Sequence, residues 1–94
     1  MHEAHIHVTC STDEHDRTKD FFEDHIADVV DGYRGAGADT QIEAEGMIRV
    51  SFNFPSVEMR ERFCRMEQRA LSLMLRHAGI NASCRLCADE CTQG

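Results

Sequence analysis

The sequence has no apolar run that approaches the roughly 20 residues needed for a membrane-spanning helix. It also has no charged N-terminal stretch followed by an apolar segment, which is the pattern of a secretory signal. These two absences predict a cytoplasmic protein with no membrane partner. A chain of 94 residues has room for one domain, residues 1–94, in which residues 88–94 form a polar C-terminal tail.

Motifs of the common enzyme classes are also missing. The sequence contains no P-loop, no glycine-rich dinucleotide fingerprint and no HExxH metalloprotease motif. Histidines and cysteines are present, but no local pattern places a nucleophile beside a base. We therefore predict a non-catalytic protein, with a small dimeric enzyme of the same fold as an alternative.

Positive charge is scarce in the first half of the chain. The net charge is −7, and residues 1–46 carry twelve acidic against three basic side chains, whereas residues 47–94 carry five acidic and seven basic ones. A nucleic-acid-binding protein needs a concentrated basic surface, so this distribution argues against direct binding of nucleic acid. It suits a protein partner that presents a basic surface.

Hydrophobic periodicity predicts four strands and two helices. Ser11 and Glu14 have the spacing of a capping box at the start of the first helix, and Ser56 is placed to cap the second. Gly79 stands where a glycine commonly ends a helix. The predicted elements are strand 2–10, helix 12–33, strand 40–45, strand 47–54, a helix that follows Ser56 and ends at His77 or Ala78, and strand 80–87.

This order, βαββαβ, is that of the α+β ferredoxin-like arrangement. It predicts a four-stranded antiparallel sheet with both helices on one face and the first and third strands in the centre. Apolar positions with a period of two in the strands, and of about 3.6 in the helices, predict the core. That core is Ala4, Ile6, Val8, Cys10, Phe22, Ile26, Val29, Val30, Tyr33, Ile42, Ala44, Ile48, Val50, Phe52, Phe54, Phe63, Met66, Ala70, Leu73, Met74, Ile80, Ala82, Cys84 and Leu86.

The opposite face of this sheet is predicted to be polar. RNA-binding domains of the same topology stack bases on aromatic residues of the central strands, and this face has none, so RNA binding is not expected. A simply solvated face is the plainest interpretation. Its residues are His5, His7, Thr9, Glu43, Glu45, Arg49, Ser51, Asn53, Ser83, Arg85 and Cys87.

The first helix is crowded with carboxylates. Asp16, Asp20, Asp24 and Asp28 form like-charged pairs four residues apart, and each pair destabilises a helix by roughly 0.2–0.5 kcal/mol. Aspartate is also a mediocre helix former. The alternative to a functional surface is a solvated, solubilising one. The predicted partner-binding residues are Asp13, Asp16, Asp20, Glu23, Asp24, Asp28 and Asp31.

Histidine and cysteine at the two ends of the chain suggest a possible zinc site, because zinc prefers these ligands in tetrahedral sets. The last strand is expected to run antiparallel beside the first, which brings its end near the start of the first strand. The predicted ligands are His5, His7, Cys87 and Cys91. Buried or unused thiols are the alternative, in which case the protein has no cofactor.

Together these features favour a binding protein, in the form of a monomer or a homodimer. The leading hypothesis is a small acidic inhibitor, encoded by a phage or plasmid, that blocks the basic surface of a nucleic-acid-handling protein. Anti-CRISPR proteins and DNA mimics act in this style, and the comparison rests on charge and size alone. A small zinc-binding domain or metal sensor is the second hypothesis.

Overall fold

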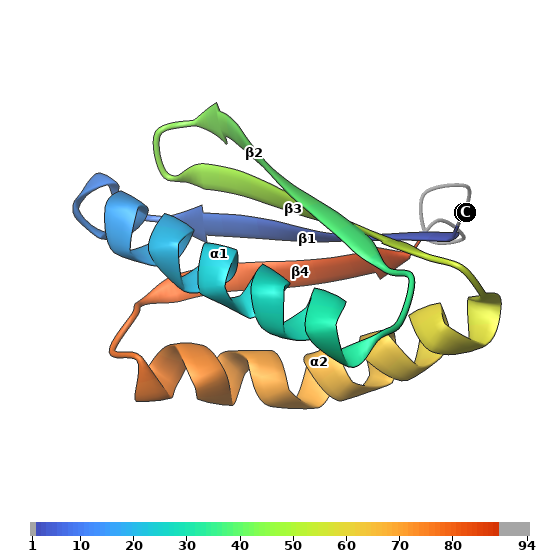
Figure 1. Ribbon diagram of the computed structural model, residues 1–94. Coiled ribbons are helices and arrows are strands. Elements are labelled where there is room, and N and C mark those ends of the chain that lie inside the picture. The colour runs from blue at the N-terminus through green and yellow to red at the C-terminus, as the bar shows by residue number, and fades with distance from the viewer. Residues whose placement is uncertain (1, 89–94) are drawn as a thin grey trace.

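The computed structural model describes residues 2–88, and it confirms the predicted α+β fold (Figure 1). Both helices lie on one face of a single antiparallel sheet, and the strand order is β2-β3-β1-β4. The elements are β1 (His2–Cys10), a 3₁₀ turn (Thr12–Glu14), α1 (His15–Gly32), β2 (Gly37–Ala44), β3 (Met47–Phe54), α2 (Val57–His77) and β4 (Ala82–Ala88).

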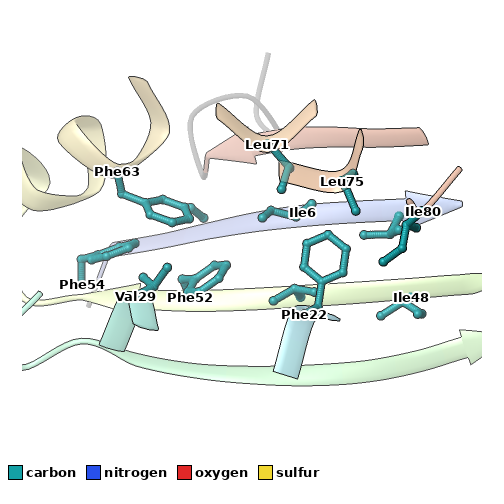
Figure 2. Close-up of a cluster of buried hydrophobic side chains, with 13 residues drawn as sticks. Ile6, Phe22, Val29, Ile48, Phe52, Phe54, Phe63, Leu71, Leu75 and Ile80 are labelled. Atoms are coloured by element: carbon teal, nitrogen blue, oxygen red, sulfur yellow. The ribbon is translucent and has the colours of Figure 1, made fainter. Parts of the chain in front are cut away.

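Strand β1 is the centre of the sheet because it pairs with β3 on one side and β4 on the other. Its alternate residues Ala4, Ile6 and Val8 are buried under the helices. Phe22 of α1 and Phe63 of α2 point toward the side chains of the strands (Figure 2). The core is therefore a single layer between the sheet and the two helices.

The helices begin in different ways. Ser56 caps α2, and its Oγ accepts a hydrogen bond of 3.2 Å from the backbone N–H of Met59, as expected. The capping box predicted for the first helix is wrong. Ser11 forms no side-chain capping bond, and the carboxylate of Glu14 pairs with Arg17 instead. A 3₁₀ turn precedes α1 at this point.

The buried side of α2 differs from the predicted one. Met66 and Leu73 were expected in the core but are 60% and 53% exposed. Leu71 and Leu75 are buried in their place, in line with Phe63 along the ridge of residues four apart. The helix is thus rotated from the expected orientation, and the rotation brings a carboxylate, Glu67, into the interior.

Strand β2 is the least well predicted element. It begins at Gly37 rather than at residue 40, and the register against β3 shifts between Ile42 and Ala44. The shift is a bulge, after which Ala44 pairs with Met47. Neither predicted core residue on this edge strand is buried: Ile42 is 45% exposed, and Ala44 is also exposed.

Candidate protein-binding face

The seven carboxylates predicted to bind a partner lie on the solvent side of α1 and of the 3₁₀ turn before it. All seven are exposed, whereas the other side of α1 buries Thr18, Phe22 and Val29. A repeat of 3.6 residues per turn separates the two sets onto opposite sides of one helix. This set is called the acidic face and consists of Asp13, Asp16, Asp20, Glu23, Asp24, Asp28 and Asp31.

Basic side chains of the chain itself neutralise little of the acidic face. Lys19 Nζ lies 3.6 Å from Glu23 Oε2. Arg17 lies in the same helix, but its guanidinium is 3.3 Å from the Glu14 carboxylate and also donates to the carbonyl oxygen of Ala78. Within residues 2–88, none of the six aspartates of the acidic face forms an ion pair. Six carboxylates therefore face solvent without an internal counter-ion.

A groove runs along one border of the acidic face, between α1 and the C-terminal half of α2. Its volume is about 410 Å³, and most of its lining is apolar. Two carboxylates of the acidic face stand on its α1 side, and the α2 side contributes a histidine and a methionine. The lining residues are Phe21, Asp24, His25, Asp28, Met74, His77 and Ala78.

A buried polar pair connects the two helices beneath this groove. His25 Nε2 lies 2.7 Å from Glu67 Oε2, and the two side chains are only 11% and 7% exposed. The ring of Phe21 stacks on that of His25, with ring centroids 6.1 Å apart. A buried carboxylate is costly unless it is hydrogen-bonded. Separation of α1 from α2 at this point would leave Glu67 without its partner, so the pair helps to hold the two helices together.

The shape and charge of the groove suit one kind of side chain. Arginine and lysine have an apolar stem and a cationic head, and they bury the stem while keeping the head near water or an anion. Phe21 and Met74 offer the apolar surface, and Asp24 and Asp28 offer the carboxylates. The lining of the groove therefore suits a cationic side chain.

The sequence interpretation missed His25, Glu67 and Phe21 as parts of a site. Phe21 and His25 are four residues apart on α1, a spacing that places them on the same side of the helix. That spacing is the feature of the sequence from which their contact could have been predicted. The contact with Glu67 spans 42 positions, and no local pattern indicates it.

The residues predicted to bind zinc lie together only in part. His5 and His7 share the open face of the sheet, with ring centroids 6.5 Å apart, and Cys87 pairs with His5 across β4 and β1. His5 Nδ1 is 3.0 Å from the Ser51 hydroxyl. Cys91 lies outside the described residues. Within residues 2–88, no three histidine, cysteine or carboxylate side chains are arranged to hold a metal ion. The zinc site stays a prediction.

Cys84 has the orientation predicted for a core residue. It pairs with the buried Val8 across β4 and β1, and it packs against the core. Burial raises the pKa of its thiol from 9.0 to about 11, with smaller contributions from Cys10 and the Glu67 carboxylate. Because thiolate is the form that binds metals and attacks electrophiles, this pKa leaves Cys84 almost entirely as the less reactive thiol at neutral pH.

No protein family model, curated protein or solved structure matches this chain. Neither helix of the described chain is long and apolar enough to cross a membrane. The function is therefore argued from the geometry and charge of the chain itself.

Proposed function

We propose that this protein is a non-catalytic, cytoplasmic binding module that docks the acidic face onto a basic surface of a protein partner. The observation that carries the proposal is the set of six aspartates that lie exposed on one surface, with no ion pair inside the described chain. A partner that handles nucleic acid presents such a basic surface. A phage- or plasmid-encoded inhibitor that acts as a DNA mimic fits this description.

The energetics of α1 support a role outside folding. Its like-charged pairs, Asp16–Asp20, Asp20–Asp24 and Asp24–Asp28, destabilise the helix by roughly 0.2–0.5 kcal/mol each. A cationic partner removes this repulsion on binding. Complementary charge also raises the association rate constant above the value of about 10⁵–10⁶ M⁻¹s⁻¹ that is typical of neutral surfaces.

The groove beside the acidic face supplies an anchor for this docking. Binding energy in protein interfaces is concentrated in a few side chains that fill pockets, and arginine is among the most frequent of them. A partner's arginine in the groove has its stem against Phe21 and Met74 and its guanidinium at Asp24 or Asp28. The groove thus gives position and specificity to a surface that otherwise supplies only charge.

A charge-matched pair of variants tests the proposal with an immobilised arginine-rich peptide as the probe. The variant Asp20→Asn/Asp24→Asn/Asp28→Asn changes the acidic face. The control variant removes three exposed carboxylates elsewhere and consists of Glu43→Gln, Glu45→Gln and Glu61→Gln.

Both triple variants change the net charge by the same amount, so a difference between them reports the location of the charge. We expect the aspartate variant to bind the peptide at least about tenfold more weakly than the control, because close charge pairs in interfaces contribute more than about 1.4 kcal/mol. Equal binding by the two variants contradicts the proposal.

A further inference from the structure

The outer side of α2 carries a stripe of arginine and large apolar residues that faces solvent. Met66 and Leu73 are 60% and 53% exposed, and they lie seven residues apart, which is about two turns of the helix. Four exposed arginines lie on this same side, away from the sheet. The set is called the basic stripe and consists of Arg62, Arg65, Met66, Arg69, Leu73 and Arg76.

The arginines of the basic stripe have no counter-charge within their own chain. Glu58 precedes Arg62 by four residues, the spacing of a helical ion pair, yet the two side chains form none. Among residues 2–88, no carboxylate pairs with any arginine of the stripe. Arginine and methionine are enriched in protein interfaces, whereas lysine is depleted. The stripe therefore has the composition of a contact surface, and its charge is left to be matched from outside.

The same layer of the molecule presents the complementary surface. The helices α1 and α2 lie side by side on the sheet (Figure 1). They run antiparallel, because Arg17 near the start of α1 donates to the carbonyl oxygens of Ala78 and Gly79 just after α2. They have 18 and 21 residues. The acidic face and the basic stripe are thus two neighbouring bands of opposite charge and similar length.

We infer that the basic stripe is the docking surface for the acidic face of a second copy of this chain. In a twofold-symmetric dimer both copies use the same surface. A twofold axis parallel to the helices places α1 of each copy over α2 of the other, so opposite charges meet in both contacts. An axis across the helices places α1 over α1, where like charges meet. The charge pattern therefore selects the first arrangement.

The symmetry also determines which residues face one another. Rotation about an axis parallel to the helices leaves every position along that axis unchanged. Each residue of α1 therefore meets the α2 residues that are level with it in its own chain. His25 is level with Glu67, and Arg17 is level with Ala78. The facing pairs are then Asp20 with Arg76 of the second copy, and Asp24 with Arg69 of the second copy.

The area of this contact suits a reversible dimer. With about 1.5 Å of rise per residue and about 10 Å of width, two such helices present a surface of roughly 30 Å by 20 Å. Two copies then bury roughly 1,200 Å² in total, which is at the lower end for specific interfaces. Dilution separates the copies and uncovers the acidic face. A basic partner then competes with the second copy for this face; that consequence rests on the proposed function, whereas the dimer does not.

Sedimentation equilibrium of the intact protein, with no partner added, tests the dimer. Two charge-reversal variants, Asp20→Lys/Asp24→Lys and Arg69→Glu/Arg76→Glu, each bring like charges together in both contacts. We expect each to raise the dissociation constant of the dimer at least about tenfold. The control Glu43→Lys/Glu45→Lys makes the same change in net charge as the aspartate variant, at exposed positions outside the helix layer, and should leave the dimer in place.

An equimolar mixture of the two charge-reversal variants is the decisive sample. In the mixed dimer one contact keeps its natural charges and the other has them exchanged, so opposite charges meet in both. We expect the mixture to dimerise, with circular dichroism confirming that each variant alone is folded. The inference is overturned by a natural protein that stays monomeric at about 1 mM, by a dimer that neither variant weakens, or by a mixture that stays monomeric. These outcomes concern self-association alone, and the peptide experiment decides the proposed function separately.

Discussion

Glycine is required at position 46, at the turn between β2 and β3. Gly46 has φ of +82°, and a Cβ built there stands 2.5 Å from the carbonyl oxygen of Cys10. The turn is also tied down on both sides, because Gly46 accepts a hydrogen bond of 2.8 Å from Cys10 and donates one of 3.0 Å to His15 Nδ1. The turn therefore has little freedom to move away from a side chain.

We predict that Gly46→Ala lowers the free energy of unfolding by more than about 2 kcal/mol, because a left-handed backbone costs about 1–2 kcal/mol and the contact with backbone adds to it. Gly79→Ala is the matched control, since φ there is +72° but the nearest atom is the flexible end of Arg17 at 3.4 Å. Urea denaturation measures both. A Gly46→Ala loss no larger than that of Gly79→Ala contradicts the account of the turn.

The raised pKa of Cys84 predicts slow alkylation in the native protein. A pKa of about 11 in place of 9.0 reduces the thiolate fraction at pH 8 by about 100-fold. The same thiol in urea is the reference, and mass spectrometry after iodoacetamide treatment measures both rates. Alkylation of native Cys84 at the rate found in urea shows that the thiol is not shielded.

Cys84 also makes stability depend on alkaline pH. Between pH 9 and about 11 the unfolded chain loses the thiol proton while the folded chain keeps it. The unfolded state then binds fewer protons, so the free energy of unfolding falls as pH rises through this range. Denaturation at pH 8 and pH 10.5 measures the fall, and we expect Cys84→Ala to show a smaller one. An identical fall in the variant assigns it to other groups.

At the level of elements, the two helices are joined by the buried pair of His25 and Glu67. We expect His25→Leu to lower the free energy of unfolding by about 3 kcal/mol, because it leaves a buried carboxylate without its partner. Replacing both residues, as His25→Leu/Glu67→Met, should be less destabilising than the single change. A double variant that is less stable than His25→Leu contradicts this role of the pair.

Strands and helices differ in how well the sequence predicts them. The bounds of β1 and β3 were predicted as they are found, because both strands alternate strictly between buried and open faces. For α2, two sets of apolar residues compete for the core. Burial of Leu71 in place of Leu73 is accompanied by the contact of Glu67 with His25, which lies 42 positions away and which no local pattern indicates. The bulge in β2 likewise depends on pairing with β3.

In the candidate site, too, features set by local sequence were predictable and features set by long-range contacts were not. The carboxylates of α1 share one exposed side, which the 3.6-residue repeat of a helix makes predictable, and their role in binding a partner stays a prediction. The groove between α1 and α2 was not predicted, since its residues come from both helices and meet only after folding. Cys91 is the one predicted ligand outside the described residues.

On the scale of the whole molecule, the acidic face lies on the helix side of the sheet. The open side carries charges of both signs, because Arg49 and Arg85 share it with Glu3 and Asp39. A surface of a single, negative charge sign is found instead on α1, which suits a cationic partner.

The most direct measurement of the central claim is the footprint of the arginine-rich peptide on the isotopically labelled protein. Amide signals of residues 16–31 in α1, and of the groove residues Met74 and His77, should change saturably, and 0.5 M salt should abolish the changes because exposed charges are screened. If the changes are centred elsewhere, or survive in the Asp20→Asn/Asp24→Asn/Asp28→Asn variant, the acidic face is a solvated surface and not a docking site.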